Sequence, residues 1–484
     1  MKPRNMLFIM SDEHNPRVLG CGGHPIIRTP NLDRLAARGV RFTDAYCNSP
    51  ICVPSRASFH TGRYVHQIRF WDNAIAYDGS IPTWGHRLRA AGHRVDSIGK
   101  LHLKSATIDN GFTQEHMPLH VVEGVGDPLG LLRDPLPVRK AALRLAADAG
   151  RGDSTYQDYD QRITMAAETW LKERAGETGG KPWVLFVSLV CPHFPLIARP
   201  EWYDLYPEDK VPWPLMYSEA ERPTHPYVKA IRASMIYDQG FDETKVRKAI
   251  AAYFGMVSYV DHNVGRLIET LEHTGLADYT RVVYTSDHGD NLGTRGLWGK
   301  STMYEESVGV PMIMAGPDVP SGVVCREPVS LVDSFPTILD CVGLQQDPND
   351  RDLPGAPLMD VVACRAVPRT VMSEYHAAGA AVATFMIRLG SFKYVHYVGM
   401  PPQLFNLATD PQETRDLGQD PGYRGVVGEA EAALRKVVDP EAADHQARAD
   451  QAAKIAELGG REAILSRGAF GYSPVPGTKA QYTT

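Results

Sequence analysis

Clustered positive charge is missing from this sequence. Its 484 residues include 51 Lys and Arg against 57 Asp and Glu, which gives a formal net charge of −6 at pH 7, and no basic tract stands out. Proteins that bind nucleic acid need concentrated positive charge to neutralise phosphates. We therefore expect no nucleic-acid partner, and the same argument disfavours a long anionic polymer.

Paired cysteines and long hydrophobic segments are missing as well. The seven Cys are odd in number and form no Cys-x-x-Cys spacing, which argues against a disulfide framework and favours a reducing compartment. The apolar run at residues 6–10 leads straight into polar residues, so it is too short for a signal peptide. No run approaches the length of a membrane-spanning helix. We expect a cytoplasmic protein with no membrane partner.

Short apolar runs alternate with amphipathic stretches along most of the chain. This alternation predicts βα units around a mostly parallel sheet. We expect strands at residues 6–11, 94–98, 183–190, 281–286 and 310–315, and helices at residues 30–38, 83–91, 161–172 and 245–272. The predicted fold class is α/β, with a large central mixed sheet, mostly parallel, flanked by helices.

Asp, Asn, Pro and Gly cluster at residues 345–357, which indicates a linker. We expect a catalytic domain over residues 1–360 and a smaller C-terminal α+β unit over residues 361–450. The strands of this unit are expected at residues 370–373, 384–389 and 393–398. Residues 451–484 end in a polar stretch without periodicity. We expect this tail to be an oligomerisation arm of a homodimer or homotetramer.

Four of the predicted strands end in polar, titratable residues. Asp12 and Glu13 follow the first strand, Lys100 and His102 the second, His193 the third, and Asp287 and His288 the fourth. In open α/β sheets, ligands bind at the carboxyl ends of the strands. One such ending would be unremarkable, but four together predict one shared site.

Asp12, Glu13, Asp287 and His288 have the chemistry of a divalent-metal site. Carboxylate oxygens suit Ca²⁺, Mg²⁺ or Mn²⁺, and a nitrogen from His288 shifts the preference toward Mn²⁺. In the alternative interpretation, Asp12 and Asp287 cap helices and His288 is a core histidine.

The pentapeptide Cys52-Val53-Pro54-Ser55-Arg56 is the sharpest local signal. Pro54 favours the start of a helix, which would place residue 52 near the helix N-terminus, where backbone N–H groups and the helix dipole stabilise negative charge. Arg56 could orient a group at residue 52 and spread its charge. The alternative is a buried cysteine beside a proline turn.

This pentapeptide resembles the Cys-x-Pro-x-Arg sequence of the type I sulfatases, whose cysteine is oxidised to formylglycine. Five segments of the chain share the resemblance: residues 7–12, 29–62, 99–102, 286–289 with 299–300, and 404–413. Together they span most of residues 5–417, and the chain is similar to the sulfatase branch of the alkaline phosphatase superfamily. Residues 71–73, 287–290 and 374–380 look like choline sulfatases. The Asp287-His288 pair and residues 224–261 also look like the phosphonate monoester hydrolases and their arylsulfatase relatives.

The resemblance implies roles for particular residues. One divalent metal, Ca²⁺, Mn²⁺ or Mg²⁺, would be held by Asp12, Glu13, residue 52, Asp287 and His288. The sulfate group would be surrounded by Arg56, Lys100, His102, His193 and Lys300. Asn73 is an expected further donor, and Glu374 and Tyr375 are expected at the alcohol. Glu13 stands where many relatives have Asp or Gln, and Ala378 replaces an acidic residue expected in a choline site.

We therefore expect a sulfuric ester hydrolase that acts on a small alkyl or aryl sulfate and depends on a maturation enzyme that makes formylglycine. The nearest alternative is a phosphonate monoester or phosphodiester hydrolase with the same site, since sulfate and phosphate centres share tetrahedral oxygens. A non-catalytic binding protein on this fold would have lost Cys52. A redox-active protein would pair Cys52 with Cys47, and the metal-binding residues would then serve no purpose.

Overall fold

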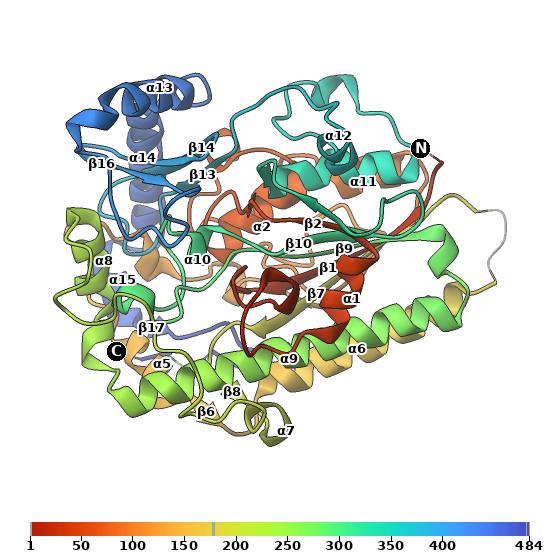
Figure 1. Cartoon of the computed structure of the whole chain (residues 1–484), viewed down its shortest axis with the longest axis horizontal. Helices are drawn as coiled ribbons and strands as arrows, with labels where there is room; N and C mark the ends of the chain where they lie inside the picture. The colour runs from red at the N-terminus through yellow and green to blue at the C-terminus, as the bar shows by residue number, and fades with distance from the viewer. Residues whose placement is uncertain (1, 177–179, 481, 484) are drawn as a thin grey trace.

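The computed structural model describes residues 2–176, 180–480 and 482–483, and its centre is an eight-stranded sheet (Figure 1). Across the sheet the strands are β11 (Val323–Cys325), β2 (Gly39–Phe42), β10 (Met312–Ala315), β9 (Thr280–Ser286), β1 (Asn5–Asp12), β7 (Val184–Pro192), β4 (Val95–Lys100) and β5 (Gln114–Leu119). The strands from β9 to β5 are parallel, whereas β10 is antiparallel to both of its neighbours. The sheet is therefore mixed and mostly parallel, as predicted.

The central strands are apolar because helices cover both of their faces. Every residue of β1 from Met6 to Met10 is fully buried, and Met6 lies opposite Val184 of β7. A parallel strand buried on two sides contains a nearly continuous apolar run, rather than an alternating one. All five predicted strands of this sheet are confirmed to within two residues at each end.

Two layers of helices enclose the sheet. Helices α6 (Thr155–Arg174) and α9 (Glu243–His273) lie side by side along one face, and α2 (Cys52–Thr61) and α11 (Ser334–Val342) lie on the other (Figure 1). The predicted helices at 30–38 and 83–91 are α1 (Pro30–Ala37) and α4 (Trp84–Ala90). Helix α6 begins before the predicted start at residue 161, because Tyr156 and Tyr159 extend its buried side.

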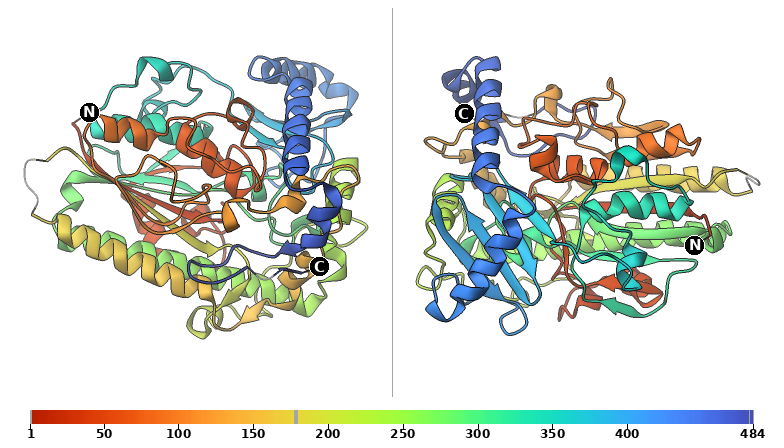
Figure 2. Two further views of the ribbon diagram at one scale, coloured as in Figure 1. Left: turned by 180° about the vertical axis from the view of Figure 1, so that it is seen from behind. Right: turned by 90° about the horizontal axis from the view of Figure 1, so that it is seen from above.

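A smaller unit with its own antiparallel sheet stands at one end of the large sheet (Figure 2). Its elements are β13 (Met372–Tyr375), β14 (Thr384–Leu389), β15 (Phe392–Tyr397), β16 (Met400–Asn406), α13 (Arg424–Arg435) and α14 (Pro440–Glu457). The sequence does not predict β16, because Pro401 and Pro402 argue against a strand. Both prolines are tolerated because β16 is an edge strand.

The C-terminal segment folds back onto its own chain. After α15 (Arg461–Arg467), β17 (Ala469–Phe470) pairs with β18 (Tyr482–Thr483), and β17 contacts the short turn Lys140–Ala142 that precedes α5 (Leu143–Ala147) (Figure 1). Contact of this tail with another subunit, and the oligomer itself, stay predictions. Within the described ranges, no helix combines the length and the apolar character needed to cross a membrane.

Candidate active site

The carboxyl ends of four adjacent strands converge on one place. β9, β1, β7 and β4 are parallel neighbours, so their ends deliver the residues that follow Ser286, Asp12, Pro192 and Lys100 to the same edge of the sheet. Helix α2 begins at this edge. The structure thus brings together the strand-end residues that the sequence predicts to share a site.

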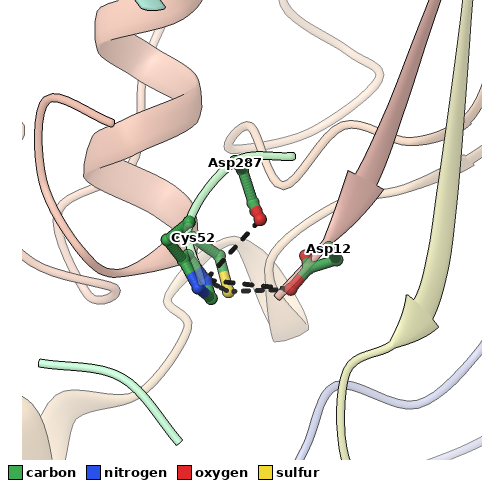
Figure 3. A group of neighbouring side chains, drawn as sticks. Asp12, Cys52 and Asp287 are labelled. Carbon is green, nitrogen blue, oxygen red and sulfur yellow. Dashed lines mark hydrogen bonds and ion pairs between the residues drawn. The ribbon is translucent and has the colours of Figure 1, made fainter. Parts of the chain in front are cut away.

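Cys52 is the first residue of α2, and it points toward the end of β1 (Figure 3). Its Sγ lies 3.2 Å from Nε2 of His288, 3.3 Å from Nζ of Lys300 and 3.7 Å from Oδ1 of Asp12. Burial, together with the charge of Asp12, raises the pKa of the Cys52 thiol to about 12. A thiol with such a pKa is a poor redox nucleophile, since the reactive form is the thiolate.

Arg56, one turn further along α2, is fully buried and links the ends of two strands. Its Nε donates to Oδ2 of Asp287 at 2.8 Å, and its Nη2 donates to Oδ2 of Asp12 at 3.1 Å. Its Nη1 donates to the Lys100 carbonyl at 2.8 Å and to Oγ of Ser188 at 2.9 Å. Arg56 therefore fixes the positions of the two central carboxylates.

Two lysines and a histidine surround the carboxylates of Asp12 and Glu13. Nζ of Lys100 lies 2.5 Å from Oδ2 of Asp12, and Nζ of Lys300 lies 3.1 Å from Oε2 of Glu13. Nε2 of His193 lies 3.5 Å from the same Glu13 oxygen. Burial would raise the pKa of Asp12, but the neighbouring charges, that of Lys100 first, hold it well below its usual range. Asp12 is thus held in the ionised form that binds cations.

The arrangement fits a divalent cation. Ligand atoms lie within 4.8 Å of one another in two overlapping sets, Asp12 with Cys52, Asp287 and His288, and Asp12 with Glu13 and His193. Oε1 of Glu13 is buried and has no hydrogen-bond partner among the described residues. Burial raises the pKa of the Glu13 carboxyl to about 8, although Lys300 opposes this change. Three converging carboxylates with imidazole nitrogens beside them suit Ca²⁺, Mg²⁺ or Mn²⁺.

Three residues of the site have a strained backbone. Glu13, His102 and Ser301 have φ angles of 69°, 54° and 82°, in the left-handed region that residues with a side chain rarely adopt. Each such residue costs about 1–3 kcal/mol and persists only where the surroundings enforce it. The end of β4 needs Gly99, with φ of 103°, because a Cβ there would lie 2.2 Å from the Ser188 carbonyl oxygen of the neighbouring strand β7.

A cavity opens beside Cys52. It is lined by Cys52, Asn73, His102, His193, Phe194, Tyr237, Lys300 and residues 470–473, with Asp127, Arg139, Arg144 and Asp148 among its other walls. Oδ1 of Asn73 accepts a hydrogen bond from the Val53 N–H at 3.2 Å, so Asn73 also supports the first turn of α2. The predicted residues His102, His193, Lys300 and Asn73 therefore share a cavity with Cys52.

Glu374 and Tyr375 are not brought into this cavity, and their contact with the substrate alcohol stays a prediction. Neither lines the cavity. Oε1 of Glu374 accepts from the His66 backbone N–H at 3.0 Å, and its Oε2 lies 2.9 Å from Nε2 of His376. The Tyr375 hydroxyl lies 2.6 Å from Oγ of Ser301. Both side chains have contacts inside the protein, and Tyr375 supports the loop after Lys300.

Comparison with known proteins identifies the family. A model of the sulfatase family matches residues 4–344, well over half of the chain. The chain belongs to the sulfatase family. A second model, for the C-terminal part of N-sulphoglucosamine sulphohydrolase, matches residues 293–439.

Sulfatases of known name align along most of this sulfatase. It is 35% identical over 443 residues to a choline-sulfatase of Rhizobium meliloti, which covers 88% of this chain and 84% of that protein. It is 30% identical over 456 residues to arylsulfatase K of Danio rerio, with 90% and 84% covered. The protein is therefore a sulfatase enzyme.

Solved structures show the same fold. The phosphonate monoester hydrolase of Agrobacterium radiobacter superposes with a TM-score of 0.70 at 22% identity, covering 89% of this chain and 95% of that one. The hydrolase SpPMH from Silicibacter pomeroyi gives a TM-score of 0.71 at 23% identity, with 90% and 94% covered. These neighbours agree with the expected alkaline-phosphatase-like architecture of the sulfatase.

Proposed function

We propose that this sulfatase hydrolyses a small alkyl or aryl sulfate monoester with a formylglycine made from Cys52 and with one divalent cation in the site. The observation that carries the proposal is the place of Cys52. Cys52 is the first residue of helix α2. Its side chain lines the cavity and lies within 3.7 Å of Asp12, His288 and Lys300. A nucleophile there would face both cation-binding carboxylates and the positive groups that stabilise a sulfuryl oxygen.

Formylglycine must be supplied by a partner. Its formation replaces the sulfur on Cβ of Cys52 by oxygen and removes two electrons, so it needs an external oxidant such as dioxygen and a separate maturation enzyme. The Cys-x-Pro-x-Arg sequence at Cys52, in a chain that belongs to the sulfatase family, supports formylglycine over direct attack by the thiol.

The proposed reaction has two steps. A hydroxyl of the hydrated aldehyde at residue 52 attacks sulfur, the bond from sulfur to the alcohol oxygen breaks, and His193 or Lys300 gives the departing oxygen a proton. The second hydroxyl then loses its proton to His102, the C=O bond re-forms, and sulfate leaves with the electrons of its bond to carbon. Addition of one water molecule to the aldehyde regenerates the hydrated form and completes the hydrolysis. A divalent cation bound by Asp12, Asp287 and His288, with Glu13 beside them, would act as a Lewis acid.

The alcohol part of the substrate is either a cation, such as choline, or a neutral group. The R. meliloti relative is named for choline sulfate, and Phe194, Tyr237 and Tyr472 give this cavity aromatic walls that could face a quaternary ammonium. However, the acidic wall residues Asp127 and Asp148 are each paired with an arginine. Choline sulfate therefore belongs in a substrate panel beside neutral alkyl and aryl sulfates.

The same site could turn over a phosphonate monoester, and kinetics separates the two. We expect kcat/KM to be higher on 4-nitrophenyl sulfate than on 4-nitrophenyl phenylphosphonate, and to vanish for both in Cys52→Ala. Cys47→Ala is the matched control, because Cys47 is also buried but does not line the cavity. A higher kcat/KM on the phosphonate would show that hydrolysis of phosphonate monoesters is the main reaction. Activity that survives in Cys52→Ala would show that residue 52 is not the nucleophile.

A further inference from the structure

The C-terminal segment supplies part of the active-site wall. Residues 470–473 line the same cavity as Cys52 and His102, although they follow the whole of the smaller unit in the sequence. This segment had been expected to pack on another subunit. Here its described residues reach the catalytic site of their own chain.

Ser473 is held firmly within this segment. The Tyr156 hydroxyl, on α6, donates to the Ser473 carbonyl at 2.6 Å, and the Tyr156 ring packs edge-on against Tyr472 at 5.4 Å between centroids. Tyr156 is 1% exposed and belongs to a helix of 20 residues that packs on the large sheet. A long helix therefore fixes the position of the tail residue.

The Ser473 side chain contacts the proposed base. Oγ of Ser473 lies 2.9 Å from Nε2 of His102. Nδ1 of His102 is buried and has no hydrogen-bond partner among the described residues. The partner of one ring nitrogen decides which nitrogen carries the proton and which keeps a lone pair.

We propose that Ser473 is a positioning residue for His102. Its Oγ accepts a hydrogen bond from Nε2–H, so Nδ1 keeps the lone pair. Nδ1 then takes the proton of the residue-52 hydroxyl when sulfate leaves, so the O–H bond breaks, the C=O bond forms and the C–O bond to sulfate breaks. This inference rests on the proposed function, because it assigns Ser473 to the second of its two steps.

Pre-steady-state kinetics of Ser473→Ala tests this role. With a 4-nitrophenyl ester, transfer to the enzyme releases nitrophenol, and His102 acts only afterwards. We expect kcat to fall at least about 10-fold, because assistance by a general base is worth roughly 10²–10⁴-fold. We expect kcat/KM to stay near the wild-type value, and a burst of one nitrophenol per site to appear. Ser473→Thr, which keeps the hydroxyl, should restore kcat.

Two further variants keep the test decisive. Ser466→Ala is the matched control, because Ser466 is an exposed serine of the same C-terminal region whose side chain donates to the Ala463 carbonyl. Tyr156→Phe removes the hydrogen bond to the Ser473 carbonyl and should give a weaker form of the same kinetic pattern, which covers the case that Ser473→Ala does not fold. An unchanged kcat, or equal losses in kcat and kcat/KM without a burst, would overturn the role of Ser473.

The proposed function can fail separately from this inference. The burst, kcat and kcat/KM are measured with the nitrophenyl ester, sulfate or phosphonate, that the wild-type enzyme turns over faster. Each variant is then compared with wild type on that ester. A wild-type preference for the phosphonate would revise the substrate. It would leave the expected burst in Ser473→Ala as the result that decides the role of Ser473.

Discussion

The ammonium group of Lys300 lies 3.3 Å from the sulfur of Cys52, although 248 positions separate the two residues in the chain. The same ammonium contacts Glu13 at 3.1 Å and lies over the Phe194 ring at 5.1 Å from its centroid. The side chain is thus held at the reacting atom by a carboxylate and an aromatic face. A fixed positive charge there would stabilise the oxygens that gain charge during sulfuryl transfer.

Lys300 and His193 should respond differently to the leaving group. His193→Ala should slow hydrolysis of an alkyl sulfate far more than that of an activated nitrophenyl sulfate, because a poor leaving group needs a proton and general acid catalysis is worth roughly 10²–10⁴-fold. Lys300→Ala should slow both, since charge on the sulfuryl oxygens develops in either case. The measurement is kcat/KM across a series of leaving-group pKa values. Equal losses across the series for His193→Ala would show that His193 only binds sulfate.

Asp12 and Asp287 should be needed to bind a divalent cation. Asp12→Asn and Asp287→Asn should each reduce the bound metal, measured by elemental analysis and by calorimetric titration of Mn²⁺ or Ca²⁺, more than Glu13→Gln does. Asp209→Asn is the control, because Asp209 is an exposed aspartate that pairs with Lys210 and belongs to neither group of possible metal ligands. Full activity of chelator-treated protein that contains no metal would contradict the assignment.

Arg56 should stabilise the fold as well as the site. In chelator-treated protein, Arg56→Ala should lower the free energy of unfolding by about 3–5 kcal/mol, because it leaves the buried carboxylates of Asp12 and Asp287 without one of their cations. Arg435→Ala, which breaks only ion pairs at the surface, should cost roughly 1 kcal/mol or less. Urea denaturation compares the two, and similar losses would mean that Arg56 is not a structural link.

Glu374 should make the fold sensitive to acid. Burial would raise its pKa, but His66 and His376 outweigh this and lower it from 4.5 to about 2. Because the folded pKa is depressed, the stabilisation is present above pH 4.5 and is lost as pH falls toward 2. Glu374→Gln should therefore be less stable than wild type at neutral pH, by roughly 3 kcal/mol. The difference should shrink between these pH values in urea titrations, and a constant difference would contradict the pKa assignment.

The sequence predicts those site residues that come directly at the end of a strand of the parallel sheet. Asp12, His193 and Asp287 follow buried parallel strands, and parallel strands bring their carboxyl ends to one edge. Glu374 and Tyr375 do not line the cavity, because a sequence pattern locates a strand but does not say which neighbours its side chains contact. Ser188 and Ser473 could not be foreseen, since a serine inside an apolar strand and a serine in a polar tail carry no local signal. Only tertiary packing brings them to Arg56 and His102.

The mass of the Cys52 peptide, measured on samples of known activity, tests the central claim most directly. Conversion to formylglycine lowers the mass of the peptide by about 18 Da, since a thiol is exchanged for an aldehyde. We expect the converted fraction to rise when a maturation enzyme is co-expressed, and sulfatase activity per mole of protein to rise in proportion. Full activity in a sample whose Cys52 peptide carries only the unmodified thiol would contradict the account.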